Sequence, residues 1–220
     1  DLSFYKPDLY ITVADPHRPG HELEYHPGEV NLLAADVVVI NKVDTADGDC
    51  IEMVRSNIRD YNPKATIIDG ASPITVENPS VIRGKRVLVV EDGPTATHGE
   101  MQYGAGTVAA NKYGAAELVD PRPYLKGTLI DTFRKYPEIG TLLPAMGYGG
   151  KQVKDLEATI AATPCDSVII GTPIDLRRVI KIKQPSTRVD YNLQEIGSPT
   201  LNDVLVDFVS KMQKGKKKNK

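Results

Sequence analysis

Several features that mark common protein classes are missing from this sequence of 220 residues. It has only two cysteines, Cys50 and Cys165, which lie far apart and form no C-x-x-C pair. We therefore expect no disulfide framework and a reduced, cytoplasmic setting. No apolar run reaches the roughly 20 residues that a membrane-spanning helix needs, and no signal peptide is recognisable. The formal net charge is −2, which gives no general attraction to nucleic acid. The composition predicts a soluble protein that binds neither membranes nor nucleic acid.

The sequence does contain enough apolar residues for a folded core. Hydrophobic residues make up 40% of the chain, which suits one large domain or two small ones. The one basic run is the tail, residues 214–220 (KGKKKNK). A run of lysines at a chain end is typical of a solvated segment, so we predict a disordered tail there.

Residues 8–73 alternate between strand-like and helix-like patterns. Short apolar runs predict three strands, and spacings of three and four residues predict a helix that ends at Asn62-Pro63. The long segment 16–29 (PHRPGHELEYHPGE) is rich in proline and glycine, which predicts a loop. This alternation predicts a parallel sheet of an α/β domain. The predicted strands are residues 9–14, 36–40 and 64–73, and the predicted helix is residues 50–63.

A second α/β unit, Rossmann-like, is predicted for residues 81–197. It begins with the apolar strand at residues 87–90, and strand and helix patterns then alternate. Residues 198–213 show a single apolar stripe, with Ser198 as the expected N-cap and Pro199 at the first helical position. We expect this helix to dock on its own domain or on a second copy of the chain, and we predict a homodimer. Residues 1–80 then form the first domain.

The segment Asn41-Lys42-Val43-Asp44 follows one of the apolar strands. An Asp carboxylate can accept two hydrogen bonds from guanine, Asn41 can bond the base edge, and the stem of Lys42 can lie along the ring. A helix, a strand and then Ser72 follow, in the order by which P-loop GTPases close a base pocket. The alternative is an ordinary polar strand end at the edge where parallel sheets bind ligands. We favour nucleotide binding, with Asn41, Lys42, Asp44 and Ser72 as the contacts.

The phosphate-binding motif that usually accompanies this base-binding pattern is missing from the sequence. No G-x-x-x-x-G-K-[ST] phosphate loop occurs in the sequence, and the first residue is Asp1, close before a strand. We therefore expect that the chain is a piece of a longer protein, with the phosphate loop upstream. On this interpretation residues 1–80 are the last part of a P-loop nucleotide-binding domain, and the chain alone has no nucleotide turnover.

Charged and imidazole side chains gather in the segment DPHRPGHE. Asp15 ends a strand and can hold Mg²⁺ directly or through water. Arg18 can bind a phosphate in bidentate fashion, and His17 can contact the same group. Three of the four histidines lie in this region, but their spacing matches no standard zinc site. We expect Asp15, His17 and Arg18 to be catalytic, and Asp15 to be the magnesium ligand.

The segment EDGPTATHG lies where a strand of the second unit leads into a helix. Backbone amides at a helix start, with Thr95 and Thr97, can form a nest for an anion, and His98 can donate to a phosphate. Arg122 can add positive charge at the same edge. The alternative is an ordinary connection capped by hydroxyl groups. We predict that Thr95, Thr97, His98 and Arg122 bind the substrate.

The sequence resembles the C-terminal half of cyclic 2,3-diphosphoglycerate synthetases. The resemblance covers almost all of residues 3–208 and is carried by FYKPDLYITVADPHRPGHELEYHPGEVNLLAADVVVINKVD, RVLVVEDGPTATHGEMQYGAGTVAA, DPRPY and LPAMGYG. It implies a related P-loop NTPase fold in a chain roughly twice this long. It also implies ATP and Mg²⁺ as cofactors and 2,3-diphosphoglycerate as substrate, which is closed to the cyclic diphosphate with release of ADP and phosphate.

Four questions remain open, the first of which is the nucleotide. The Asn-Lys-x-Asp pattern favours GTP, whereas the resemblance implies ATP. The region also looks like the equivalent part of tetraacyldisaccharide kinases, which use ATP, so we predict ATP. A GTPase-like switch or metallochaperone is the second possibility, and a related phosphotransferase with another substrate is the third. A non-catalytic, regulatory or dimerising role for the second unit also remains open.

Overall fold

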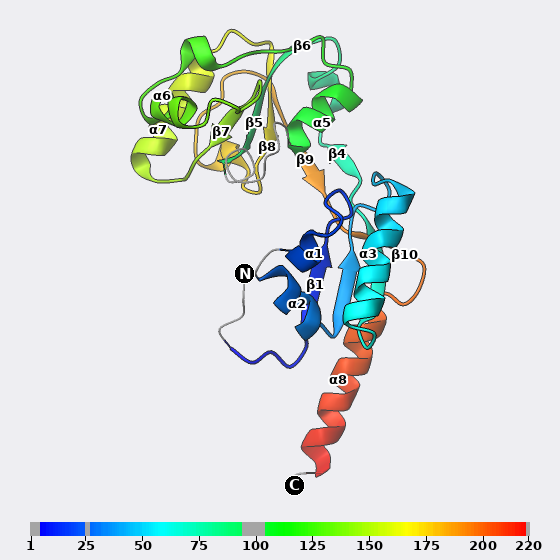
Figure 1. Ribbon diagram of the computed structural model, residues 1–220. Helices are drawn as coiled ribbons and strands as arrows, with labels where there is room; N and C mark the ends of the chain where they lie inside the picture. Colours follow the sequence, from blue (N-terminus) through cyan, green and yellow to red (C-terminus); the bar gives the residue numbers. More distant parts are fainter. Residues whose placement is uncertain (1–4, 25–26, 94–103, 219–220) are drawn as a thin grey trace. The chain divides into compact units, whose positions relative to one another are not determined.

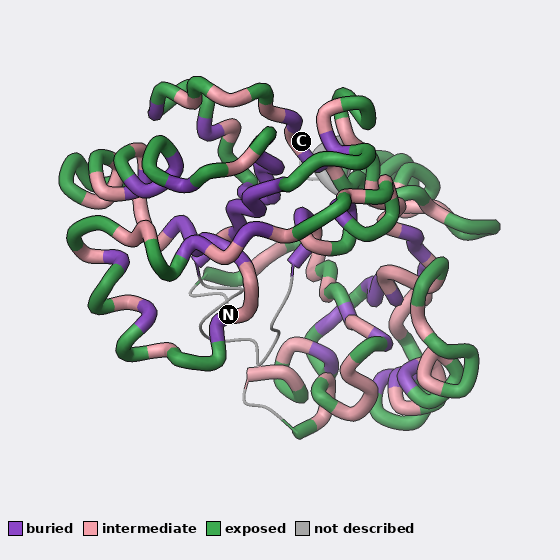
Figure 2. Tube along the Cα trace, turned by 90° about the horizontal axis from the view of Figure 1, so that it is seen from above, coloured by how far each residue is buried: buried purple, intermediate pink, exposed green. Residues whose placement is uncertain are grey.

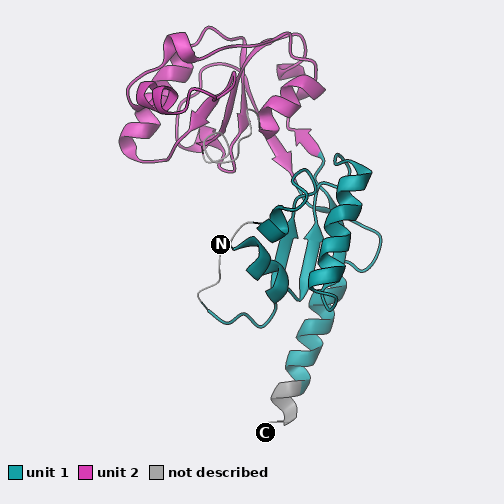
Figure 3. Ribbon diagram, viewed as in Figure 1, with its two compact units in different colours: residues 1–73, 192–220 teal, residues 74–191 magenta. Residues whose placement is uncertain are grey.

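The structure is a computed structural model that describes residues 5–24, 27–93 and 104–218. The chain divides into two compact units. Unit 1 comprises residues 1–73 and 192–220, and unit 2 comprises residues 74–191 (Figure 3). Each unit contains a sheet with parallel strands and flanking helices. The predicted fold class is therefore confirmed as mixed α/β with parallel sheets.

Unit 1 is built on a sheet with the strand order β1-β2-β3-β10. The first three strands run parallel, and β10 lies antiparallel beside β3. Its described elements, in chain order, are β1 (Ile11–Ala14), α1 (His21–Glu24), α2 (Gly28–Ala34), β2 (Val37–Ile40), α3 (Gly48–Tyr61), β3 (Thr66–Ala71), β10 (Gln194–Ile196) and α8 (Leu201–Lys218) (Figure 1).

The two faces of this sheet are covered unequally. On one face, α2 and α3 pack over the strands, because both helices present fully buried aliphatic side chains. On the other face, the cover comes from residues just before β1 and from the start of α8. The first cluster includes Ala14, Leu32, Val38, Ile40, Val54 and Ile58. The second consists of Val37, Val39 and Ile68, with the partly buried Leu9, Leu201 and Val204 packed against it.

Helix α3 begins and ends where its sequence dictates. The Asp47 carboxylate accepts a hydrogen bond from the backbone amide of Asp49 at 2.9 Å, which caps the first turn. At the other end, the buried Asn62 amide donates to the carbonyl oxygens of Leu32 and Ala35, both at 2.8 Å. These bonds satisfy the carbonyls at the end of α2 and fix α3 against it.

Unit 2 contains a second sheet with the order β4-β9-β8-β5-β6. β4 is antiparallel to β9, and the other pairs are parallel. β7 also pairs in parallel with β5, beyond the point where β6 ends. The described elements, in chain order, are β4 (Ile74–Val76), η1 (Pro79–Val81), β5 (Arg86–Asp92), α5 (Ala105–Lys112), β6 (Glu117–Leu118), η2 (Arg122–Tyr124), α6 (Thr128–Lys135), β7 (Leu143–Ala145), α7 (Gly150–Ala162), β8 (Ser167–Gly171), η3 (Leu176–Arg178) and β9 (Ser186–Tyr191).

The core of unit 2 lies around its two central strands, β5 and β8. Residues 87–90 and 168–170 have no exposed surface. These strands read as unbroken apolar runs because helices cover both of their faces. Figure 2 shows buried segments grouped together with exposed segments around them.

The boundaries of the units differ from those predicted. We expected the first domain to end at residue 80 and the second at residue 197, but the divisions fall at 73/74 and 191/192. Residues 74–76 pair with β9, and Ile82 is fully buried in the core of unit 2. The short strand β10 then returns the chain to unit 1 by pairing with β3.

Three other predictions differ from the structure. Residues 16–29 are not simply a loop, because α1 forms within them and α2 begins at Gly28. The last helix begins at Leu201, not near Ser198, because Thr200 and Asp203 cap it reciprocally: each backbone amide donates to the other side chain, at 2.9 and 3.2 Å. It also continues to Lys218, through part of the predicted disordered tail. Lysine has a high helix propensity, which is compatible with this extension.

Candidate functional site at the carboxyl edge of unit 1

The parallel strands of unit 1 bring several predicted site residues to one edge. The last residues of β1 and β2, Ala14 and Ile40, are partners in the sheet, and Ile40 is in turn the partner of Asp69 in β3. Asp15 and Asn41 follow the ends of the first two strands directly. This is the edge at which parallel α/β sheets bind ligands.

Hydrogen bonds connect the segment after β2 with the turn after β3. The Ser72 hydroxyl donates to Asn41 Oδ1 at 2.9 Å, and the Ser72 amide donates to Asp44 Oδ1 at 3.1 Å. The amide of Val43 donates to the Gly70 carbonyl at 3.1 Å. A Cβ atom on Gly70 would lie 2.4 Å from Leu193 Cδ1, so the exposed Leu193 side chain would have to shift. Three of the four predicted base contacts therefore form one bonded group.

This group has unused hydrogen-bonding capacity. Asn41 uses its side-chain oxygen as an acceptor, and Asp44 uses one carboxylate oxygen. Among the described residues, the Asn41 amide nitrogen and Asp44 Oδ2 have no hydrogen-bond partner. A donor and an acceptor at one sheet edge match the alternating acceptors and donors on the edge of a purine base.

Lys42, the fourth predicted base contact, lies on the other side of this segment. Its ammonium donates to Asp15 Oδ2 at 2.6 Å, and both side chains are about one-third exposed. Lys42 has a positive φ of 59°, which is uncommon for a residue with a side chain. Burial by itself raises the pKa of Asp15, but the hydrogen bond and charge of Lys42, together with the His17 amide, outweigh it and lower the pKa.

His17 and Arg18 are held close to this ion pair. The His17 amide donates to Asp15 Oδ1 at 3.1 Å, and its Nε2 lies 3.0 Å from the Thr45 hydroxyl. The Arg18 amide donates to the Asp15 carbonyl at 2.9 Å. The turn after β1 therefore brings all three predicted catalytic residues, Asp15, His17 and Arg18, to one place.

The described residues contain no group of three or more His, Cys, Asp and Glu side chains that could hold a metal ion by themselves. Asp15 alone fits the usual protein share of a magnesium site, because Mg²⁺ often takes one carboxylate and completes its shell with phosphates and water. Both Asp15 oxygens are bonded in this structure, to Lys42 and to the His17 amide. Each oxygen keeps a second lone pair, but Mg²⁺ at Oδ2 would compete with the positively charged Lys42 ammonium.

The predicted substrate residues belong to unit 2. Thr95, Thr97 and His98 lie outside the described residues. Arg122 lies in η2, where its amide and Nε both bond Asp120 Oδ1, at 3.0 and 2.9 Å. Arg122 is thus held in its own turn, with nearly half of its side chain exposed.

The structure shows a buried acid that the sequence analysis did not select. Glu91, near the end of β5, is only 2% exposed. Its Oε1 accepts a hydrogen bond from the Thr107 amide at 2.9 Å, and the amides of Gly106 and Gly104 also bond the carboxylate. Burial raises the pKa of Glu91 to about 7, although these amides act in the opposite direction. The amides at the start of α5 are therefore already bonded to Glu91, and the anion nest predicted around Thr95 and Thr97 lies outside the described residues.

Three glycines leave room for this carboxylate. A Cβ atom on Gly104 or Gly171 would lie 2.6 or 2.4 Å from Glu91 Oε2, and one on Gly106 would lie 3.0 Å from Oε1. In the sequence, the one signal for this site was the pair Gly104 and Gly106 at the start of α5. Because β6 and β7 lie on one side of β5 and β8 on the other, the order in which the strands are added to the sheet reverses at β5. Such switch points are the preferred ligand sites of open α/β sheets.

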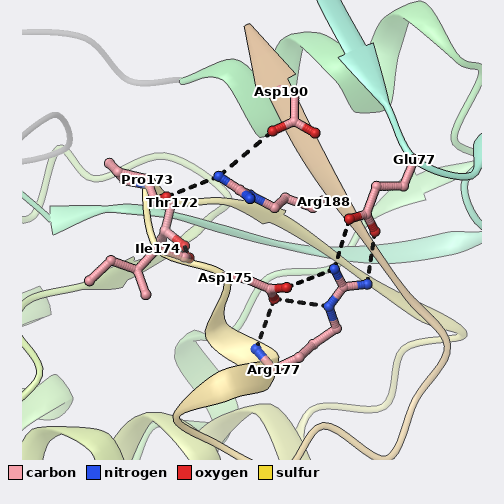
Figure 4. A network of polar contacts seen from close by, with 8 residues as sticks. All are labelled: Glu77, Thr172, Pro173, Ile174, Asp175, Arg177, Arg188 and Asp190. Carbon is pink, nitrogen blue, oxygen red and sulfur yellow. Dashed lines mark hydrogen bonds and ion pairs between the residues drawn. The ribbon is translucent and has the colours of Figure 1, made fainter.

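A charged network lies elsewhere in unit 2, around Arg177. Its guanidinium forms two bonds to Glu77, at 2.8 and 2.9 Å, and two to Asp175, both at 2.9 Å (Figure 4). Hydrogen bonding to Arg177 lowers the pKa of both Glu77 and Asp175. Nearby, Arg188 donates to the Pro173 carbonyl at 3.0 Å. The guanidinium of Arg177 already donates to two carboxylates. We therefore interpret Arg177 as a structural residue.

The sequence of this chain is similar to that of a protein named as a synthetase. No protein-family model matches the chain. Over 217 residues, 99% of the chain, the sequence is 59% identical to arginine synthetase ArcE of Thermococcus kodakarensis. The two are homologous. The match covers 48% of that protein, so this chain spans about half the length of its curated relative. In the described residues, no helix has the length and apolarity to cross a membrane.

Proposed function

We propose that this chain is part of a nucleotide-driven synthetase that forms arginine, and that unit 1 holds the nucleotide base. The observation that carries the proposal is the 59% identity, over nearly the whole chain, to a protein named arginine synthetase. The bonded group of Asn41, Asp44 and Ser72 supports it, because it leaves a donor and an acceptor for a base.

The chemistry of arginine formation fits a phosphoryl-transfer site. Citrulline differs from arginine by one oxygen in place of one nitrogen. The terminal phosphoryl group of the nucleotide can pass to this ureido oxygen, ammonia can then attack the carbon, and the oxygen leaves as phosphate. One proton is released, and the nucleoside diphosphate is the other product. The task of the protein is to position the groups and to neutralise charge.

In this proposal, the residues after β1 act at the phosphates. Arg18 and His17 contact the transferred group, and Asp15 contributes a carboxylate to Mg²⁺, which when bound shields the phosphate charge. Lys42 holds Asp15 when the ion is absent, as the 2.6 Å bond indicates. ATP is the proposed nucleotide. GTP is the alternative, because Asp44 can accept the two donors of guanine as well as the amino group of adenine.

A second candidate is the cyclisation of 2,3-diphosphoglycerate, which the resemblance of the long sequence strings supports. The chemical logic is the same. A phosphoryl group is transferred from the nucleotide to one substrate phosphate. An oxygen of the second substrate phosphate then attacks the phosphorus of the first, which closes the ring and releases the transferred group as inorganic phosphate. Both reactions activate an oxygen by phosphorylation and then displace it, so one type of site can serve either.

The test uses a chimera in which this chain replaces the matching residues of the Thermococcus kodakarensis relative. The chimera is incubated with Mg²⁺ and either ATP or GTP, with citrulline plus ammonium or with 2,3-diphosphoglycerate. Amino-acid analysis detects arginine, and ³¹P NMR detects cyclic diphosphate and free phosphate. We expect arginine, formed in proportion to ADP. Cyclic diphosphate instead would support the second candidate, and GTP hydrolysis that needs neither substrate would contradict both.

A variant of the chimera tests the role of unit 1 separately. Asp44→Asn keeps the size of the side chain but removes its charge, and we expect weaker nucleotide binding with an unchanged product. The matched control is Asp60→Asn, which alters an exposed acid in α3. Equal nucleotide affinity in both variants would contradict base binding by unit 1, whatever the product.

A further inference from the structure

On the edge strand β1 of unit 1, one face is left largely uncovered by the residues that the structure describes. Its register places Ile11 beside Val37 and Val13 beside Val39, so these four side chains share a face of the sheet. The two β2 residues are 1% and 2% exposed, whereas Ile11 is 40% and Val13 is 63% exposed. The cover that Leu9 and α8 give to β2 therefore stops before β1.

The opposite face of β1 is fully engaged. The Thr12 hydroxyl donates to the Asn31 carbonyl of α2 at 3.0 Å, and Ala14 is buried in the cluster that contains Leu32. The strand is therefore well placed in the sheet, and its bare side is not a sign of fraying. Strands of parallel sheets are normally buried on both faces by helices.

The outer edge of β1 is also open. Among the described strands, β1 pairs only with β2. Proteins usually protect such an edge with a charged residue, a proline or a bulge, because an apolar edge strand readily pairs with other chains. The strand Ile-Thr-Val-Ala contains no charged residue and no proline. An unprotected edge beside a bare apolar face is suited to a permanent neighbour.

We propose that this neighbour is the other half of the full-length protein, which adds a strand beside β1 and apolar cover over Ile11 and Val13. The relative is about twice as long as the part that matches this chain, so it contains a polypeptide of comparable size to provide both. Parallel strands are joined by crossover helices of the same chain, which is how a sheet of this type gains an edge and a covering layer together. A second copy of this chain, pairing β1 with β1, would extend the sheet without such a helix. This inference does not depend on the proposed reaction.

The test measures access to position 13. Val13→Cys is introduced into this 220-residue chain and into the chimera, and the rate of alkylation at that thiol is followed by mass spectrometry. We expect alkylation to be slower in the chimera by roughly tenfold or more, because a buried thiol reacts only after local opening. The control is Ile130→Cys in unit 2, at a position 44% exposed, which should react equally in both proteins.

Two results would overturn the proposal. Equal alkylation of Cys at position 13 in both proteins would show that the other half does not cover β1. Protection that appears in the 220-residue chain as its concentration rises would assign the surface to a second copy. If the substituted chain does not fold, hydrogen exchange of residues 9–14 in the unsubstituted proteins gives the same answer: slower exchange in the chimera supports the proposal, and equal exchange rejects it.

Discussion

The two units place polar groups at the carboxyl edges of similar parallel sheets, but they treat these groups differently. In unit 1, Asn41, Asp44 and the Asp15–Lys42 pair are partly exposed, and some of their hydrogen-bonding capacity is unused. In unit 2, Glu91 is buried and bonded by backbone amides of its own unit. The apolar cover of the strands differs in the same way. The central residues of β5 and β8 in unit 2 are fully buried, whereas one face of β1 in unit 1 is exposed. Unit 1 is therefore the part for which we propose both a ligand and a covering neighbour.

The strongest test of this difference is the change Arg18→Ala in the chimera. If the edge of unit 1 works on phosphate groups, loss of a guanidinium should lower kcat by about 10²- to 10³-fold, the range seen when one donor to a developing charge is removed. Steady-state kinetics with ATP measure the effect. The control is Arg134→Ala, since the Arg134 side chain is 75% exposed and pairs with Asp131, one turn earlier in α6. Full activity in the Arg18 variant would refute its proposed role.

A smaller effect should follow from filling the space beside Glu91. In Gly171→Ala, the new methyl group would lie 2.4 Å from Glu91 Oε2 and 3.0 Å from the Gly106 amide nitrogen. Overpacking of this kind typically costs about 1–3 kcal/mol, so we expect a lower midpoint in denaturant unfolding. The matched control is Gly150→Ala, where nothing lies within 4 Å. If both variants unfold at the same denaturant concentration, the tight packing around Glu91 does not stabilise unit 2.

Much of the fold could be predicted from the sequence, and the parts that could not have physical reasons. Helix α3 (Gly48–Tyr61), predicted at residues 50–63, was recognisable because Val54 and Ile58 recur on one face. The turn at Ser72 was recognisable because it follows an apolar strand. The one-turn helix α1 was hidden by the prolines and glycines around it. It depends on contacts such as the bond from the Gly20 amide to the Glu22 carboxylate, at 3.0 Å. Such contacts have no periodic pattern.

The candidate site was predictable only in unit 1. Asp15 and Asn41 directly follow apolar strands, so the parallel topology alone brings them together. Glu91 could not be selected in this way, because two adjacent acids at the end of VLVVED look like an ordinary polar strand end. Its environment is made by Gly104 and Thr107, which are distant in sequence, and by Gly171 in another strand. The strand β7 was missed because its central residue, Pro144, argues against a strand.

The pH dependence of stability gives a finer test of the comparison. Because the pKa of Glu91 is raised from 4.5 to about 7, the folded protein keeps a proton that the unfolded chain loses above pH 4.5. This contribution is fully present below pH 4.5 and is lost as the pH rises through 7. We expect the free energy of unfolding of unit 2 to fall over this range, and Glu91→Gln to weaken the fall. A slope unchanged by the substitution would show that Glu91 is not its source.

The smallest effect is expected for Arg177→Lys, which tests whether the network in Figure 4 is only structural. Lysine keeps the charge but cannot bond Glu77 and Asp175 with a planar fork. The Arg177 side chain is 35% exposed, so the loss of stability should be within about 1 kcal/mol, as for other partly solvated ion pairs. Activity of the chimera should not change. A tenfold fall in activity at unchanged stability would mean that Arg177 contacts a ligand. Unit 2 would then share in binding, and the contrast between a self-contained unit and a working one would not hold.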